Sequence, residues 1–198
     1  SRSSMAGVLQ PHQRLLVSWR GRGALPTLSG AELLGAPIYL PGDALIAALY
    51  LNELLMRLMP VHVANPLLFA LYQQGLERLA AGEDIEWSLR VWERDLLEEL
   101  GYGLNLVNDV CSGEAFMAVA PYCYRHEHGA QLEHGPCSGV RLHGATLIAL
   151  QQGVRPDRES RQQAKQLMRY TLAHYLGPRP LISRSLFKRP VVGQNRES

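Results

Sequence analysis

Long apolar runs, lysine and cysteine are all scarce in this chain of 198 residues. A membrane helix needs about 18 or more consecutive apolar residues, and the nearest stretch, residues 44–59, is interrupted by Asn52, Glu53 and Arg57. The first residues contain no apolar core of a signal peptide. Three cysteines are an odd number, which is typical of a reducing compartment. We therefore expect a cytoplasmic protein that has no membrane partner.

The signatures of common catalytic sites are also missing. The sequence has no GxxxxGKS/T loop for ATP and no GxSxG, HExxH or GxGxxG motif. Asp109 and Glu114 are isolated acids in an expected loop, and they make no convincing catalytic pair. We therefore predict that the protein is not an enzyme and that it uses no cofactor.

The charge that is present is sorted by position. Residues 1–30 hold four arginines and no acid, residues 31–149 hold six basic and fifteen acidic residues, and residues 150–198 hold ten basic and three acidic residues. The overall charge of +2 therefore hides basic ends of +4 and +7 around a middle of −9. Basic ends indicate contact with a polyanion. Eighteen of the twenty basic residues are arginine, whose planar fork suits phosphate and carboxylate, although a genome rich in arginine codons would give the same bias.

Strand-like sequence comes first in the chain, and helical sequence follows. Residues 15–19 and 25–34 predict two short strands. Because two strands alone are only marginally stable, we interpret residues 1–40 as the last part of a larger β-unit whose earlier strands are missing from this chain. The predicted helices are 43–59 with Asp43 as cap, 66–82 with Asn65 as cap, 84–100, 145–152 and 157–176.

Residues 43–198 are thus expected to form a helical domain, and the fold class is α+β with mostly α structure. Residues 102–144 hold all three cysteines together with many glycines and histidines, and they are expected to be an irregular loop region. The tail that follows Gly177 and Pro178 is expected to be loosely ordered toward its end.

The predicted helix 84–100 carries the first candidate site. Arg90 and Arg94 are four residues apart and therefore lie on one face, where they would form a cationic edge with Trp87 beside an apolar groove. Such a groove suits a short acidic peptide with an aromatic end. The plainer alternative, which the sequence alone favours, is that Arg90 pairs with Glu86 and Arg94 with Glu98 on an ordinary helix surface.

The two basic ends of the chain supply the second candidate site. Residues 175–189 combine four cations with one phenylalanine and no acid, and nucleic-acid binding needs cations for phosphates and aromatic rings for bases. A solvated basic tail is an equally good interpretation. The predicted DNA contacts are Arg14, Arg20, Arg22, Arg179, Arg184, Lys188 and Arg189.

A metal site is the third candidate, and we do not expect it to be formed. Cys111 begins Cys-Ser-Gly-Glu and Cys137 begins Cys-Ser-Gly-Val, so each looks like a CxxC motif without its second cysteine. A structural zinc needs four ligands, and no other pair has a suitable spacing. We therefore predict ordinary thiols. The other candidate ligands are Cys123, His126, His128 and His134.

Four stretches of the chain resemble the bacterial recombination mediator family RecO. They are Gly-Val-Leu-Gln-Pro at 7–11, Tyr-Leu-Asn-Glu-Leu-Leu at 50–55, Leu-Gly-Tyr-Gly-Leu-Asn at 100–105, and Tyr-Leu-Gly at 175–177 followed by Pro-Leu at 180–181 and Ser-Arg at 183–184. Their order and spacing together are specific and extend over nearly the whole length. The resemblance implies an N-terminal OB-type barrel, with residues 15–34 as its last part, and a helical-bundle domain.

The resemblance also implies a function without enzymatic chemistry. Proteins of the RecO family bind single- and double-stranded DNA, anneal complementary strands, bind RecR, dock the acidic C-terminal tail of single-stranded DNA-binding protein and help to load RecA. An arginine at the position of Arg90 helps to hold that tail. Many members bind zinc through two CxxC pairs, whereas Glu114 and Val140 stand at the second positions here. The chain therefore resembles the members that lack the metal. Separately, we expect the protein to be a monomer.

Two functions from other classes are the alternatives. One is a metal-dependent enzyme built on the cysteines and histidines of residues 111–137. The other is a structural helical adaptor that binds protein and not DNA.

Overall fold

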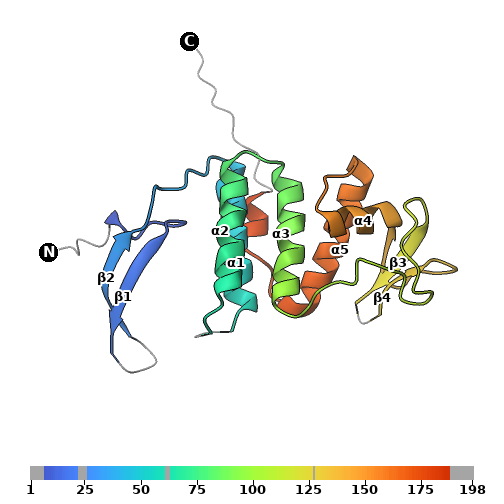
Figure 1. Cartoon of the computed structure of the whole chain (residues 1–198), viewed down its shortest axis with the longest axis horizontal. Coiled ribbons are helices and arrows are strands. Elements are labelled where there is room, and N and C mark those ends of the chain that lie inside the picture. The colour runs from blue at the N-terminus through green and yellow to red at the C-terminus, as the bar shows by residue number, and fades with distance from the viewer. Residues whose placement is uncertain (1–6, 22–25, 61–62, 127, 188–198) are drawn as a thin grey trace, which may run out of the picture.

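The structure, a computed structural model, describes residues 7–21, 26–60, 63–126 and 128–187. A strand pair lies at one end of its long axis, most of the helices lie in the middle, and a small sheet lies at the other end (Figure 1). This mixture of helices and small sheets agrees with the expected class. The elements are β1 (Leu15–Arg20), β2 (Thr27–Leu33), α1 (Asp43–Leu58), α2 (Pro66–Ala80), α3 (Ile85–Glu99), β3 (Pro121–Arg125), β4 (Gly129–Leu132), β5 (Val140–His143), α4 (Gly144–Gln152), α5 (Arg158–Leu176) and α6 (Ser183–Leu186).

β1 and β2 lie in the two stretches predicted as strands, and they pair in antiparallel orientation. His12, which precedes β1, connects this region to the helices because its Nδ1 lies 3.1 Å from the Tyr72 hydroxyl of α2. Leu16 and Trp19 of β1 are 59% and 65% exposed. Because two strands cannot close a barrel, the assignment of β1 and β2 to an OB-type barrel stays a prediction.

The polar residues that precede α2 and α3 explain where these helices begin. The Asn65 side chain accepts a hydrogen bond from the backbone N–H of Leu68 at 3.0 Å, as its predicted capping role requires. Asp84 accepts one from the backbone N–H of Trp87 at 3.1 Å in the same way. Both helices therefore begin where the sequence indicates.

The prediction that Asp43 caps α1 is wrong. Gly42 precedes the helix with a φ of 54°, Asp43 is the first helical residue, and no side chain caps this end. The positive φ, which glycine adopts without strain, forms a turn in which the Ala44 N–H donates to the Pro41 carbonyl at 3.1 Å. That bond satisfies an early N–H of the helix without a side-chain cap.

Apolar residues at helical spacing on α3 and α5 form much of the core. α2 packs so closely on α3 that a Cβ added to Gly75 would lie 2.8 Å from the Trp92 ring. Each fully buried large apolar side chain stabilises the fold by roughly 1.5–3 kcal/mol, so this packing outweighs the surface ion pairs. The buried core residues of the two faces are Leu89, Trp92, Leu96, Ala164, Leu167, Met168 and Leu172.

The prediction of an irregular region at 102–144 is wrong for its second half. β3 pairs with β4 on one side and with β5 on the other, both antiparallel. The strands are only four or five residues long, and Tyr122, Cys123 and Tyr124 are buried consecutively. Because these residues do not alternate between buried and exposed, the sequence lacks the period-2 pattern of a half-exposed strand.

The prediction of ordinary thiols is also wrong for two of the three cysteines. Cys123 of β3 forms a disulfide with Cys137, while Cys111 is free and exposed. The cytoplasmic location therefore stays a prediction that the cysteines no longer support. In the described ranges, no group of three or more His, Cys, Asp or Glu side chains is placed to hold a metal ion.

No helix in the described part of the chain is both long enough and apolar enough to cross a membrane.

Candidate functional site

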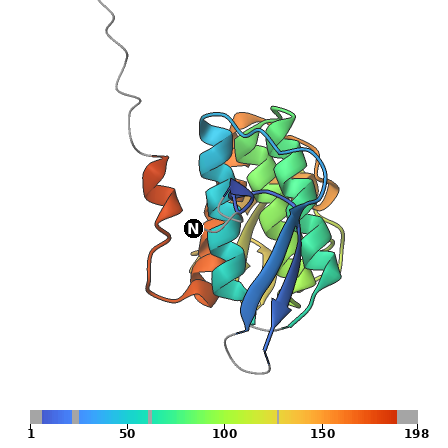
Figure 2. The ribbon, with the colours of Figure 1, turned by 90° about the vertical axis from the view of Figure 1, so that its left-hand side faces the viewer.

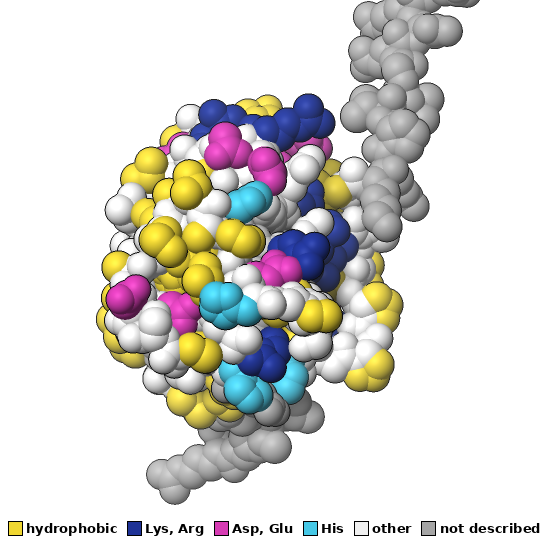
Figure 3. Space-filling view, turned by 90° about the vertical axis from the view of Figure 1, so that its right-hand side faces the viewer, with side chains coloured by type: hydrophobic (Ala, Val, Ile, Leu, Met, Phe, Trp, Pro, Cys, Tyr) yellow, Lys and Arg dark blue, Asp and Glu magenta, His cyan; other side chains and the backbone are white. Residues whose placement is uncertain are grey.

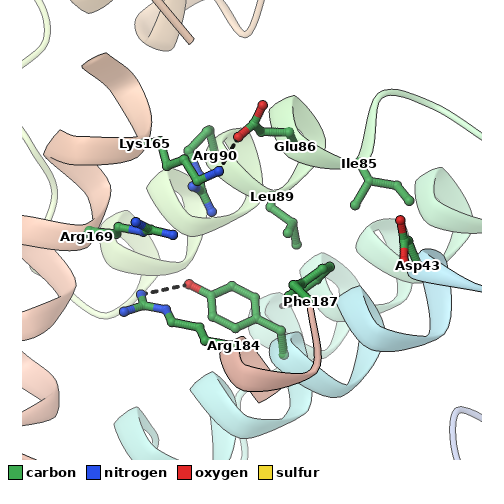
Figure 4. Close-up of a pocket in the computed structure, with 10 residues that line it drawn as sticks. Asp43, Ile85, Glu86, Leu89, Arg90, Lys165, Arg169, Arg184 and Phe187 are labelled. Carbon is green, nitrogen blue, oxygen red and sulfur yellow. Dashed lines mark hydrogen bonds and ion pairs between the residues drawn. The ribbon is translucent and has the colours of Figure 1, made fainter. Parts of the chain in front are cut away.

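A cavity of about 610 Å³ lies between α1, α3, α5 and α6. This size falls in the range of sites that enclose a small ligand or the end of a peptide. Side chains from all four segments surround it (Figure 4), so residues distant in the sequence meet there. The lining residues are Asp43, Tyr50, Ile85, Glu86, Leu89, Arg90, Lys165, Arg169, Arg184 and Phe187.

Cations dominate one side of this cavity. Figure 4 shows them on the side opposite Asp43, with Leu89 and Phe187 between the two sides. Glu86 is paired with one of them through a Lys165 Nζ–Glu86 Oε1 contact of 2.5 Å. The lining thus holds four cations and two carboxylates, a net charge of +2. The cations are Arg90, Lys165, Arg169 and Arg184.

A buried hydrogen-bonded network connects two of these arginines. The Tyr50 hydroxyl donates to Glu93 Oε1 at 2.6 Å, and Arg90 donates to the same oxygen. Arg184 Nη2 donates to the Tyr50 hydroxyl at 3.3 Å, and its guanidinium lies 5.6 Å from the centre of the Tyr50 ring. Burial, together with the Glu93 carboxylate, raises the pKa of Tyr50, so the hydroxyl stays protonated. Arg90 and Arg184 are therefore held in one network.

The alternative that Arg90 and Arg94 form surface pairs with Glu86 and Glu98 is wrong in its partners. Arg90 is only 6% exposed, and it pairs with the buried Glu93 three residues later. Because a buried ion pair loses its solvation, its stability depends on both partners being present. Arg90 is thus an internal residue that also lines the cavity.

Arg94 and Trp87 do not line the cavity and instead contact the end of α4. Arg94 pairs with Asp95 and donates to the carbonyl of Leu150 at the end of α4. The Trp87 indole is buried, and its Nε1 donates to the Gly153 carbonyl at 3.1 Å. The end of α4 therefore covers these two side chains. Of the three predicted peptide contacts, only Arg90 lines the cavity.

Several lining residues were not expected from the sequence. Tyr50 belongs to a stretch that carries the family resemblance, but nothing in that stretch marks it as a partner of an arginine. Lys165 and Arg169 lie one turn apart on α5, a spacing that predicts a shared helix face. That spacing could have suggested a cationic face, but not which helix it would meet.

The predicted DNA contacts lie in two separate regions. Arg14 and Arg20 are exposed on or beside β1, Arg179 is exposed between α5 and α6, and Arg184 lines the cavity. In both views the strand pair and α6 lie apart, with α1 beside α6 (Figures 1 and 2). The four described arginines of this set thus belong to two parts of the structure, the strand pair and the segment around α6. Arg22, Lys188 and Arg189 lie outside the described residues.

Comparison with known proteins identifies the family. Residues 41–185 match the family model described as "Recombination protein O C terminal". A protein named DNA repair protein RecO from Methylococcus capsulatus is 47% identical over 187 residues, which cover 94% of this chain and 76% of the relative. The RecO proteins of Nitrosospira multiformis and Pseudomonas putida are 42% and 40% identical, over 94% and 96% of this chain and 78% and 82% of the relatives.

The chain belongs to the RecO family. The resemblance drawn from its four short stretches is thereby confirmed. The matched region 41–185 contains every residue that lines the cavity except Phe187. The candidate site is therefore part of the region that the RecO C-terminal model recognises.

The face of the molecule at the β3–β5 sheet differs from the cavity in the side chains that it exposes. Figure 3 shows yellow hydrophobic side chains gathered on this face, beside histidines and charged groups of both signs. The loop that precedes β3 exposes Val107, Met117 and Val119. This face thus mixes apolar groups with charges of both signs, unlike the cation-rich side of the cavity.

Asp109 has a structural role at this end. Burial alone would raise the pKa of its carboxyl, but hydrogen bonds from the backbone N–H groups of Ser112, Cys111 and Leu132 outweigh burial and hold the pKa below its ordinary value. The carboxylate thus joins the 109–112 turn to β4. Both carboxylate oxygens of Asp109 accept backbone hydrogen bonds, so this residue stabilises the local fold.

Proposed function

We propose that this RecO-family chain acts in DNA repair as a recombination mediator that performs no catalysis. It binds single- and double-stranded DNA, promotes annealing of complementary strands, works with RecR and helps to load RecA. It also docks the acidic tail of single-stranded DNA-binding protein in the cavity between α1, α3, α5 and α6. The observation that carries this proposal is a cavity with four cations beside an apolar centre.

The cavity suits the end of an acidic peptide for two reasons. Carboxylates of the peptide would form charge-assisted hydrogen bonds with the arginines, and such bonds are stronger than those between neutral groups. An aromatic side chain at the peptide end would contact Leu89, Ile85 and Phe187. Recognition of acidic motifs by clustered arginines is a recurring mode of peptide binding.

Peptide binding tests the first part of this proposal. The probe is a fluorescent aspartate-rich peptide that ends in phenylalanine with a free carboxylate. Arg169→Glu should weaken its binding about tenfold or more, because it reverses an exposed charge in the lining. Arg158→Glu, at the exposed first residue of α5, is the matched charge reversal and should have little effect. Equal affinities of the wild type and Arg169→Glu would remove the cavity from the proposal.

DNA binding tests the second part. The exposed Arg14 and Arg20 supply attraction to phosphates that does not depend on sequence. Affinity for single-stranded DNA should therefore fall steeply between low and physiological salt in an anisotropy titration. A flat dependence on salt would contradict the proposal. No DNA binding at low salt, with normal peptide binding, would instead favour the structural adaptor.

A further inference from the structure

The segment that follows α5 is fixed on α1 by two charged side chains. Glu53 of α1 accepts hydrogen bonds from the backbone N–H groups of Ile182 and Ser183, at 2.8 and 2.9 Å, and from the Ser183 hydroxyl. Arg57 donates to the carbonyls of Leu176 and Arg179. A carboxylate at the start of α6 and a cation at the end of α5 are each the favourable charge for a helix terminus. The basic segment therefore has a defined position.

This docking gives the segment a place in the cavity wall. Leu181 and Ser183 are buried against the helices, and they fix the start of α6. Arg184 then lies over the Tyr50 ring, and Phe187 lines the cavity beside it (Figure 4). Arg184, which the sequence groups with the DNA contacts, is thus in reach of a ligand in the cavity.

We infer that an acidic peptide in the cavity and single-stranded DNA compete for the segment 179–187, so that each weakens the binding of the other. This inference rests on the proposed function. One guanidinium cannot pair fully with a carboxylate and a phosphate at the same time. Carboxylates in the cavity also place negative charge beside α6, within the screening length of about 8 Å at physiological salt.

The consequence is reciprocal. If the peptide lowers the affinity for DNA by a given factor, DNA must lower the affinity for the peptide by the same factor. The strand pair does not line the cavity, so DNA contacts through Arg14 and Arg20 persist when the peptide is bound. The competition is therefore partial: the peptide removes the contribution of the C-terminal segment and leaves that of the strand pair.

The test measures binding of a labelled oligo-dT to the full chain with and without a saturating amount of the acidic peptide. The wild type should show an apparent Kd for DNA about fivefold higher with the peptide, at the lower end of typical couplings. Arg184→Ala should reduce this factor to less than about twofold. Arg169→Ala removes the same charge from the same cavity but from α5, so at peptide saturation it should keep the fivefold effect.

The outcomes separate this inference from the proposed function. A peptide that binds the wild type without changing its DNA affinity overturns the competition and leaves the tail site intact. Equal loss of coupling in Arg184→Ala and Arg169→Ala also overturns it, because the effect would then come from total charge and not from α6. A peptide that fails to bind at all contradicts the proposed site itself. An acidic peptide without the terminal phenylalanine controls for simple ionic effects, and it should not change DNA binding.

Discussion

The two basic ends of this chain are built in different ways. The β1–β2 pair exposes Leu16 and Trp19 and is connected to α2 through His12. The C-terminal segment is shorter, yet Glu53 and Arg57 of α1 bind its backbone directly. The charge of the two segments has the same sign, whereas their contacts with neighbouring residues and helix ends decide where each segment lies. Two segments of the same charge sign thus have different structures. The segment around α6 lines part of a cavity, whereas the β1–β2 pair is exposed.

The largest effect is expected from removing the buried Arg90–Glu93 ion pair beside the cavity. Arg90→Ala leaves Glu93 buried without a cation, and it should destabilise the fold by about 3 to 5 kcal/mol. Arg20→Ala on the exposed strand should change stability by less than about 0.5 kcal/mol. Urea unfolding of both variants measures the contrast. Wild-type stability of Arg90→Ala would show that the pair is not buried in solution.

A second test removes a constraint that lies far from both basic ends. The Cys123–Cys137 disulfide spans 14 residues, and its reduction should lower the free energy of unfolding by about 3 kcal/mol. Peptide mapping without reductant should find these two cysteines joined and Cys111 available for alkylation. Peptide and DNA affinities should change little on reduction. Alkylation of all three cysteines in the native protein would contradict the disulfide.

A third test releases the C-terminal segment alone. Burial would raise the pKa of Glu53, but hydrogen bonds from Ser183 and Ile182 outweigh burial and lower it. Because the pKa is lower in the folded state, the ionised Glu53 stabilises the fold fully at pH values above its ordinary pKa of 4.5. This contribution to the free energy of unfolding is lost as the pH falls from there through the lowered pKa of the folded state. Glu53→Gln should mimic the acid state at neutral pH and cost about 2 kcal/mol in docking of the segment.

Hydrogen exchange resolved by residue measures that docking. Amides of Ile182 and Ser183 should lose protection in Glu53→Gln at neutral pH, and in the wild type at acid pH. Glu32→Gln, at an exposed position of β2, is the control and should leave them protected. Unchanged protection in Glu53→Gln would show that α6 is held by other contacts.

The smallest expected effect concerns the strand pair. Arg20→Ala should weaken DNA binding a few-fold and reduce the slope of log affinity against log salt by about 1, as expected for one lost phosphate contact. Peptide binding should be unaffected, since Arg20 is outside the cavity lining. An unchanged salt slope would mean that the exposed β1 arginine does not contact DNA.

The sequence predicted the parts of the fold that local rules determine. Asn65 caps α2, and the apolar spacing of Leu89, Trp92 and Leu96 identifies the buried face of α3, because both depend on residues close in the chain. The sheet was missed since the consecutive burial of residues 122–124 hides its period. The Cys123–Cys137 disulfide depends on that sheet, so it was missed as well.

The candidate site was predicted only in part, for a tertiary reason. Arg90 was predicted from its helical spacing with Arg94 and favoured further by the family resemblance. The sequence does not show that the end of α4 covers Trp87 and Arg94. Nor does it show that Arg184 meets Tyr50, since these residues lie in different helices whose contact depends on how α1 and α6 pack. The charge pattern predicted an anionic ligand without locating the cavity.

Photo-crosslinking tests the central claim most directly. The acidic peptide would carry a photoreactive benzoylphenylalanine in place of its terminal phenylalanine, and its adducts on the wild-type chain would be mapped by mass spectrometry. If the cavity is the peptide site, the adducts should fall in residues 85–90 of α3 and in 184–187 at the end of the C-terminal segment. Adducts concentrated on the β1–β2 pair or on the β3–β5 sheet would contradict the account.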